Sequence, residues 1–249
     1  MSSLAPLVQP TGTLPTELAA AAVHGLRGLS AKTDTAPTWV LQTRALAGQR
    51  GEHALFAGLD LQLQAGSLTW LRGRNGRGKT SLLRLLAGLS TAAAGDIQLC
   101  GHSQREIGPA WRSQLLYLGH QNALKDDLSA TEALAFLARL HGLPASPQAL
   151  AEALNRLGVA HRQHAPVRTL SQGQRRRVAL ARLALAVDVP LWLLDEPFDA
   201  LDQDGITALN ALLSDYCAQG GCVLLTSHQP LSLQQPEPQM LDLEPYACS

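Results

Sequence analysis

A glycine-rich segment that ends in lysine and threonine has the residue types needed to bind the phosphates of a nucleotide. It fits the pattern G-x-x-x-x-G-K-[ST] and reads Gly73-Arg74-Asn75-Gly76-Arg77-Gly78-Lys79-Thr80. Glycines let backbone N–H groups turn inward around phosphates, and a helix after the segment adds its positive end. Lys79 is placed for the β- and γ-phosphates, and Thr80 offers a hydroxyl to Mg²⁺. An ordinary glycine turn is the alternative, but the apolar strand before the segment and the helical pattern after it favour a phosphate-binding loop.

Two neighbouring carboxylates follow a short apolar strand later in the chain. Leu191–Leu194 is apolar at every position, and Asp195 and Glu196 come directly after it. Ligands of open α/β sheets bind at the carboxyl ends of the strands. We therefore expect Asp195 to hold Mg²⁺, directly or through water, and Glu196 to orient or deprotonate an attacking water. The alternative is an acidic pair at the start of a helix before Pro197, which the phosphate loop upstream disfavours.

A second candidate anion site lies at the start of a predicted helix over residues 172–187. Ser171 and Gly173 are the residue types that would let a hydroxyl and backbone N–H groups point outward there. The chain already has one phosphate loop. A second anion site therefore implies a second nucleotide, or the same nucleotide held by another copy of the chain.

Taken in order, these segments resemble the ATP-binding cassette (ABC) ATPases over about residues 39 to 229. The Walker A, signature and Walker B motifs of that family correspond to residues 73–80, 170–174 and 191–196, with Gln172 in place of the usual first glycine of the signature. Gln121 resembles the glutamine of the Q-loop and His228 the switch histidine, and residues 199–202 resemble the D-loop. All six motifs occur in the order that the family has.

The resemblance implies an α/β fold of the P-loop NTPase class, with an ABC-type nucleotide-binding domain that hydrolyses ATP with Mg²⁺. The catalytic residues that it implies are Glu196, His228 and Gln121. The metal-binding residues that it implies are Thr80, Gln121 and Asp195.

The resemblance also implies how ATP is shared between two copies of the chain. In one copy, the residues implied to contact ATP are Gly73, Arg74, Asn75, Gly76, Arg77, Gly78, Lys79, Thr80 and Ser81. Ser171 and Gly173 of the other copy would complete the same site. A homodimer is therefore expected in the ATP-bound state.

Some motif contexts are similar to those of the ATP-binding subunits of haem exporters in cytochrome c maturation. The residues that carry this likeness are Tyr117–Asn122, Ser171–Arg182, Asp195–Asp202 and Thr226–Gln229. The likeness implies a peripheral protein on the cytoplasmic face of the inner membrane that powers haem export or the release of a haem-loaded chaperone. Its partners would be integral membrane subunits, contacted through about Asn122 to Leu134. The alternatives are the ATPase of another small ABC exporter and a soluble ABC ATPase of the iron–sulfur assembly type.

Two further expectations concern residues near the nucleotide. Many family members place an aromatic side chain on adenine near residues 48–50, but no aromatic residue occurs from Val40 to Leu55. The Arg50 guanidinium could stack on the base instead, or Phe56 could approach it. The run Arg175–Arg177 is expected to form a solvated face of the signature helix.

The elements that must position these residues alternate between strands and helices. One strand is expected to begin at Trp39, and further strands are expected at 59–63, 68–71, 97–99, 115–118, 191–194 and 222–226. Helices are expected at 79–89, 131–157 (two helices), 172–187 and 203–217. This alternation indicates a mainly parallel α/β sheet, and the helix-only stretch indicates an inserted helical subdomain at about 122–172. Residues 1–37 are rich in Ala, Pro, Thr and Ser and are expected to form a flexible N-terminal extension before an ATPase domain at 38–249.

Composition excludes several classes of protein. The 249 residues carry 20 Lys+Arg and 20 Asp+Glu, and a net charge of zero removes the electrostatic case for binding nucleic acid. The longest apolar candidate, residues 183–194, is broken by Asp188 and Pro190, so no transmembrane helix of about 20 residues is expected. The four cysteines form no C-x-x-C pair, which disfavours a metal or disulfide site and makes the cytosol the default compartment.

Overall fold

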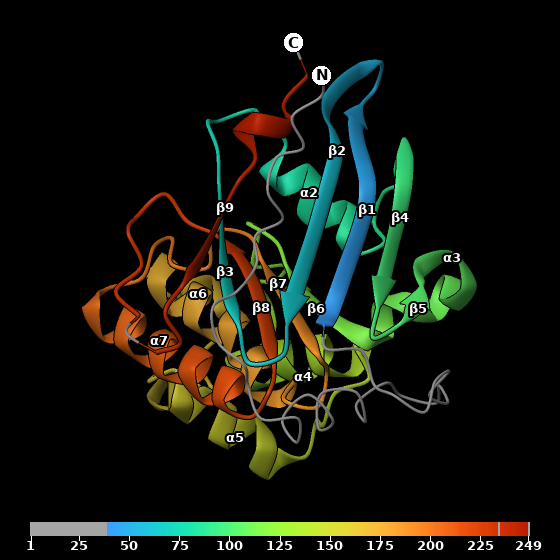
Figure 1. Cartoon of the computed structure of the whole chain (residues 1–249). Coiled ribbons are helices and arrows are strands. Elements are labelled where there is room, and N and C mark those ends of the chain that lie inside the picture. The colour runs from blue at the N-terminus through green and yellow to red at the C-terminus, as the bar shows by residue number, and fades with distance from the viewer. Residues whose placement is uncertain (1–38, 234, 249) are drawn as a thin grey trace, which may run out of the picture.

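The computed structural model describes residues 39–233 and 235–248, and the expected N-terminal extension lies outside them. The strands form two sheets (Figure 1). The antiparallel sheet has the order β2-β1-β4-β5 and consists of β1 (Trp39–Arg50), β2 (His53–Gln64), β4 (Ala94–Leu99) and β5 (His102–Ser103). The parallel sheet has the order β6-β7-β8-β3-β9 and consists of β3 (Leu68–Arg72), β6 (Leu115–Leu118), β7 (Leu191–Leu194), β8 (Cys222–Thr226) and β9 (Gln239–Asp242).

The antiparallel sheet departs from the expected, mainly parallel arrangement. In β2, Leu59, Leu61 and Leu63 are buried while the polar residues between them face outward, which is the pattern of a sheet covered on one side. The long strand β1 pairs antiparallel with β2 and β4, with several register shifts along the β1–β2 pair. The expectation of a parallel sheet is therefore wrong for this half of the strands and correct for the other sheet.

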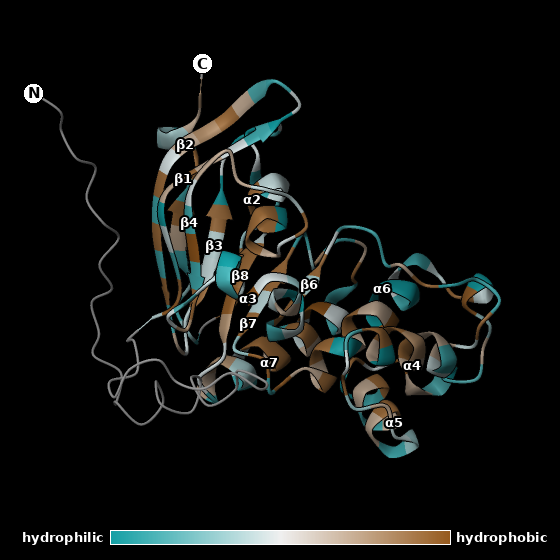
Figure 2. Ribbon diagram, turned by 90° about the vertical axis from the view of Figure 1, so that its right-hand side faces the viewer, coloured by the Kyte–Doolittle hydropathy of each residue, from teal (hydrophilic) through white to brown (hydrophobic). Residues whose placement is uncertain are grey.

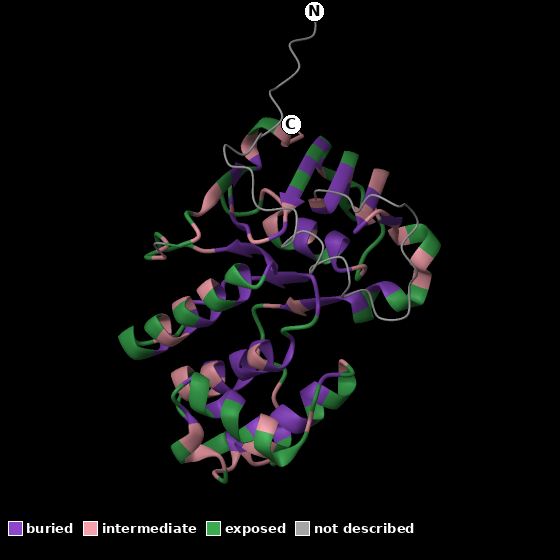
Figure 3. Cartoon of the chain, turned by 60° about the horizontal axis from the view of Figure 1, so that its bottom comes forward, coloured by how far each residue is buried: buried purple, intermediate pink, exposed green. Residues whose placement is uncertain are grey.

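The parallel sheet is buried on both faces, as its apolar strands predict. Successive residues of β7 enter different cores: Leu191 and Leu193 join the cluster that lies toward the antiparallel sheet, and Trp192 and Leu194 join the cluster that lies toward the helices. Figure 3 shows the central strands of this sheet as almost wholly buried between the surrounding layers, whereas only one residue of the edge strand β9 is buried. The rigid sheet thereby fixes the loops that leave its carboxyl ends.

The helices are divided between the two faces of the parallel sheet. Leucines of α2 (Lys79–Leu86) pack in the core that the two sheets share, and buried residues of α7 (Gln203–Ala218) pack on the opposite face. Beyond that face, α4 (Ala130–Leu140), α5 (Pro147–Arg156) and α6 (Gln172–Leu180) project to one side of the strands (Figure 2). We propose that this projection is the inserted helical subdomain of about residues 122–172.

Local signals explain where these helices begin and end. Ser129 and Ser146 cap α4 and α5 with their hydroxyls, and Pro147 occupies the first turn of α5, where its missing N–H costs nothing. The helix expected over 172–187 is α-helical only to Leu180 and continues as a 3₁₀ helix, Ala181–Leu185.

The remaining elements are short. They are α3 (Gln104–Ile107) and 3₁₀ helices at Gly108–Gln114, Ala160–Arg162, Val167–Thr169 and Glu244–Tyr246. Within the described part of the chain, no helix combines the length and the apolar character needed to cross a membrane.

Candidate active site

The site lies where the parallel strands end. The phosphate loop follows β3, the two carboxylates follow β7, His228 follows β8 and the Q-loop follows β6. Neighbouring parallel strands end at the same sheet edge, so segments far apart in the sequence meet there. This topology brings together most of the residues that the motifs single out.

The phosphate loop joins β3 to α2 with three glycines in left-handed or related backbone conformations. Gly73, Gly76 and Gly78 have φ of 141°, 83° and 95°, which are values that other residues rarely adopt. A Cβ on Gly78 would also lie 3.2 Å from Leu55 and Phe56 side-chain atoms. Gly78 is the N-cap of α2, and neither a capping side chain nor an acidic residue engages the first turn. The amides of that turn are therefore free of side-chain competition for an anion.

Lys79 places its ammonium group across the loop. Its Nζ donates to the carbonyl oxygens of Gly73 at 2.7 Å and Arg74 at 3.3 Å, so the side chain bends back across the loop. Lys79 is the first residue of α2, and its ammonium adds to the positive end of that helix. Both features favour a polyphosphate at this place.

Both acidic residues are buried, and hydroxyl groups hold the carboxylate of Asp195 and the backbone of Glu196. Asp195 and Glu196 are 4% and 8% exposed. Thr80 Oγ1 donates to Asp195 Oδ2 at 2.9 Å, and Thr226 Oγ1 donates to Asp195 Oδ1 at 2.9 Å. The same Thr226 oxygen accepts from the backbone N–H of Glu196 at 2.8 Å. Thr226 was not among the expected site residues, although its hydroxyl connects both acidic residues.

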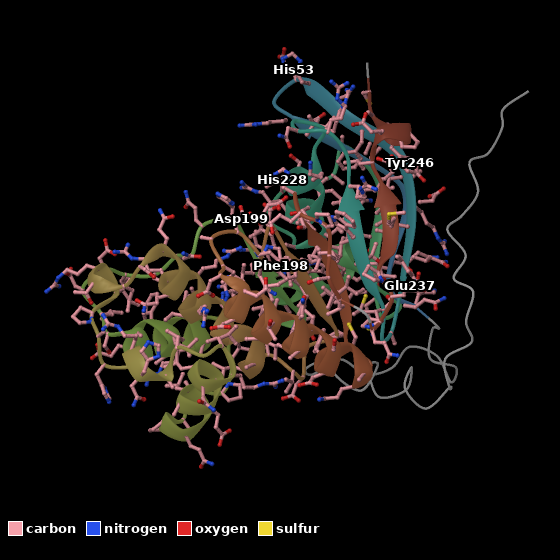
Figure 4. All side chains as sticks on the ribbon, turned by 90° about the vertical axis from the view of Figure 1, so that its left-hand side faces the viewer. His53, Phe198, Asp199, His228, Glu237 and Tyr246 are labelled. Atoms are coloured by element: carbon pink, nitrogen blue, oxygen red, sulfur yellow. The ribbon has the colours of Figure 1, made fainter. Side chains whose placement is uncertain are left out.

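His228 approaches the carboxylate of Glu196 from β8. Its Nε2 lies 3.5 Å from Glu196 Oε1, and its backbone N–H donates to Glu196 Oε2 at 2.9 Å. His120 Nδ1 lies 3.5 Å from Asp199 Oδ2 on the same side of the site. Figure 4 shows Asp199 and His228 close together between the helical projection and the strands.

A cavity of about 350 Å³ unites these groups. It is lined by Arg50, Leu55, Asn75, Gly76, Gly78, Lys79, Thr80, Ser81, His120, Asp195, Glu196, Asp199 and His228. Gly73 and Arg74 lie instead on a neighbouring hollow, together with Lys79 and His228. Arg77 lines neither of these two spaces.

The expected residues Gln121, Ser171 and Gly173 do not line this cavity. Gln121 is exposed, and its neighbour His120 reaches the cavity instead. Ser171 is the N-cap of α6, where its hydroxyl accepts from Gln174 N at 3.2 Å and Gln174 Oε1 accepts from Ser171 N at 3.1 Å. The roles of all three residues stay predictions.

The donor set at Thr80 and Asp195 fits Mg²⁺. A hydroxyl and a carboxylate are hard oxygen ligands, and they already lie within 2.9 Å of each other. Among the described residues, no group of three or more His, Cys, Asp or Glu could hold a metal without further ligands.

Arg50 and Phe56, the two residues expected near adenine, differ in whether they line the cavity. Arg50 and Leu55 line the cavity, whereas Phe56 is fully buried and does not line it. The Phe56 ring packs on Gly48 so closely that a Cβ there would lie 2.5 Å from ring carbons. Stacking by Arg50 remains the prediction.

The expectation of a solvated arginine face on α6 is wrong at its centre. Arg176 is 2% exposed, and Arg177 pairs with Asp202 of the D-loop. Arg175 is half-buried and pairs with Asp126 at 3.2 Å. Arg176 lies four positions before the buried Leu180, and this helical spacing is the signal that would have placed it on the inner face.

Comparisons with known proteins agree with this geometry. Residues 56–199 match the family model described as "ABC transporter". The chain is 50% identical over 191 residues to the cytochrome c biogenesis ATP-binding export protein CcmA of Pseudomonas putida, which covers 77% of this chain and 90% of that protein. It is 44% identical to the CcmA protein of Aromatoleum aromaticum, with 85% of this chain and 98% of the relative covered.

Solved structures agree with the fold. An ABC transporter ATP-binding protein from Pyrococcus furiosus superposes with a TM-score of 0.70 at 23% identity, covering 84% of this chain and 99% of that one. The structure of an ATP-binding subunit of an ABC transporter superposes with a TM-score of 0.65 at 26% identity, covering 76% and 79%. The chain therefore belongs to the ABC transporter ATPases and, within them, to the CcmA family of cytochrome c biogenesis ATP-binding export proteins.

Proposed function

We propose that this chain is the ATP-hydrolysing subunit that powers haem export, or the release of a haem-loaded chaperone, in the maturation of c-type cytochromes. The names of its relatives support cytochrome c biogenesis and export. The observation that carries the ATPase part is the buried Glu196 carboxylate, which faces the phosphate-loop cavity and is held by His228. Haem as the cargo is supported by the motif contexts around the Q-loop and the signature.

In the proposed mechanism, the phosphate loop binds ATP through the first-turn amides of α2, and Lys79 turns from Gly73 and Arg74 to the β- and γ-phosphates. Thr80 and Asp195 would hold Mg²⁺, which would supply positive charge to neutralise the phosphates. Glu196 orients the attacking water and takes its proton as the oxygen bonds to the γ-phosphorus and the bond to ADP breaks. His228, which lies beside the Glu196 carboxylate, contacts the γ-phosphate.

We further propose that two copies close head to tail around the ATP. Ser171 and Gly173 of one copy would then approach the γ-phosphate bound by the other. Their position outside the cavity of their own chain, and the exposure of Ser171, support this arrangement. Closure on ATP and reopening after hydrolysis would be a population shift driven by the ligand.

The proposed membrane partner is an integral subunit of the cytochrome c maturation system, at the cytoplasmic face of the inner membrane. The proposed contact is residues 122 to 134, where α4 begins. Phe136, two residues beyond this range on α4, is 39% exposed, with Lys125 Nζ 4.3 Å from its ring centroid. This exposed ring supports the idea that the start of α4 meets another protein.

Cells provide the test of this function. A strain whose only copy carries Lys79→Ala should fail to mature c-type cytochromes, because the cation for the phosphates is lost, while other haem proteins stay normal. Haem staining of cytochrome c beside an immunoblot for the variant measures this. Holo-cytochrome c at the wild-type level would contradict the role in cytochrome maturation.

A further inference from the structure

The buried guanidinium of Arg176 joins its own helix α6 to the Q-loop and to the segment after β7. It lies on α6 and makes six hydrogen bonds, five of them to backbone carbonyls. The acceptors are the carbonyl oxygens of Gly119, His120, Asp195, Glu196 and Pro197, and Oδ1 of Asn122. Side-chain contacts of this kind fix where a backbone runs, because each carbonyl is tied to a rigid planar fork.

The two branches of the fork reach different segments of the site. Nη1 donates to His120 at 3.3 Å and to Asn122 at 3.1 Å in the Q-loop. Nη2 donates to Glu196 O at 2.6 Å and to Asp195 O at 3.3 Å. The 2.6 Å bond to Glu196 is the shortest that Arg176 makes.

Glu196 needs such support because its backbone is strained. Its φ is +48°, a region that residues other than glycine rarely occupy. Strained residues persist where their surroundings over-determine them, and they cluster at active sites. Thr226 Oγ1 holds the N–H of Glu196, and Arg176 Nη2 holds its carbonyl. Both backbone polar groups of the strained residue are thus fixed.

Burying a cation costs free energy unless hydrogen bonds or opposite charges compensate it. Arg176 is 2% exposed and, among the residues described, forms no salt bridge with a carboxylate oxygen. Burial lowers the pKa of Arg176, while Asp199, Asp195 and Glu196 oppose this effect through their charges. Carbonyl oxygens therefore supply the compensation that a buried guanidinium requires.

We propose that Arg176 is a positioning residue for hydrolysis, which holds the Glu196 carboxylate and the Q-loop backbone in their working geometry without touching ATP. The inference rests on the proposed role of Glu196 as the group that activates water. It predicts that Arg176 supports turnover while it leaves nucleotide binding alone.

The test uses the full chain with Arg176→Gln, Arg176→Lys, Glu196→Gln and the double variant Arg176→Gln/Glu196→Gln. Turnover and the Kd of Mg·ATP are measured for each, beside thermal melting. Arg176→Gln should lower kcat about 10²-fold, the loss typical of a misplaced catalytic group, while the Kd stays at the wild-type value. Arg176→Lys should be intermediate, because one ammonium cannot span both branches of the fork.

The double variant separates positioning from general damage. If Arg176 acts through Glu196, adding Arg176→Gln to Glu196→Gln lowers kcat no further. Arg156→Gln is the matched control, since Arg156 is an exposed arginine that pairs with Asp215 away from the cavity. It should keep wild-type turnover. If Arg176→Gln does not fold, Arg176→Lys must still show reduced kcat with an unchanged Kd.

Three outcomes would overturn the inference. If kcat is unchanged in Arg176→Gln but reduced in Glu196→Gln, the role of Arg176 is refuted and the proposed role of Glu196 stands. Losses that multiply in the double variant, or a Kd that weakens as much as kcat falls, show a general structural role instead. Wild-type turnover in Glu196→Gln refutes the proposed role of Glu196 and this inference with it.

Discussion

A single hydroxyl, that of Thr226, connects the two acidic residues of the site. It donates to Asp195 Oδ1 and accepts from Glu196 N, and it is fully buried at the end of β8. Because Asp195 also accepts from Thr80, the same network reaches the phosphate loop. Thr226 therefore sets the distance between the group that would hold Mg²⁺ and the group that would activate water.

Thr226→Val should lower both stability and turnover. Valine fits the same space but leaves Glu196 N–H and one Asp195 oxygen without their partner, which costs about 1–3 kcal/mol. Urea unfolding and steady-state ATPase assays measure the two effects. Thr226→Ser keeps the hydroxyl and is the control, so it should retain most of both. A valine variant as stable and as fast as the wild type would show that the hydroxyl does not hold the site.

The residues that motifs predict and those that they miss differ in a physical way. Lys79, Thr80, Asp195 and Glu196 follow from the sequence because binding phosphate and Mg²⁺ dictates their types, whereas His228 follows from the resemblance to the family. Thr226 and Arg176 act on backbone groups of distant segments, and such contacts exist only once the strands are paired. Helical spacing could have placed Arg176 on a buried face, but its acceptors could not be read from the sequence.

At the scale of elements, the C-terminal segment braces the phosphate loop. Strand β9 pairs with β3, and the 3₁₀ helix Glu244–Tyr246 follows it. Glu244 Oε1 accepts from Arg74 N at 2.8 Å, and its Oε2 lies 3.3 Å from Arg77 Nε. The ion pair with Glu244 directs the Arg77 side chain to the C-terminal segment, and neither Arg74 nor Arg77 lines the cavity.

Glu244→Ala should weaken ATP binding more than turnover. The loop loses the acceptor that fixes Arg74 N, and one lost hydrogen bond of about 0.5–1.5 kcal/mol corresponds to a KM for ATP about 2- to 13-fold higher. The kcat should change little, since Asp195 and Glu196 are held independently. Glu237→Ala is the control, because Glu237 is exposed and lies at the far end of the same segment (Figure 4). An equal KM in both variants would contradict the bracing role.

The sequence predicted elements better than their pairing. Alternation in residues 59–63 and the apolar run of β7 identify strands, because burial on one or both faces imposes those patterns. The pairing of β1 with β2 and β4 was missed, since register shifts and a positive φ at Ala45 interrupt its alternation. Strand β9 was missed as well: only Leu241 of its four residues is buried, so it carries no period of its own.

At the scale of the whole molecule, the two proposed halves of the ATP site lie apart. The phosphate loop and carboxylates gather at the carboxyl ends of the parallel strands, while the start of α6 belongs to the helical projection (Figure 2). Ser171 is exposed there, and Gly173 is packed so that a Cβ would lie 2.9 Å from Ala200 O. Neither Ser171 nor Gly173 lines the cavity of its own chain. These facts favour a second copy as the source of the contacts that Ser171 and Gly173 would make with the γ-phosphate.

Glu196→Gln is expected to trap this pair of copies. Glutamine keeps the shape of the pocket and removes the carboxylate that activates water, so ATP stays bound and the closed state accumulates. Light scattering should then report twice the mass of one chain with Mg·ATP and a single chain without nucleotide. Adding Ser171→Arg should abolish the dimer and spare ATP binding by the monomer, because the new side chain crowds the facing γ-phosphate. A dimer that forms equally well without ATP, or one that survives Ser171→Arg, would exclude the head-to-tail arrangement for this chain.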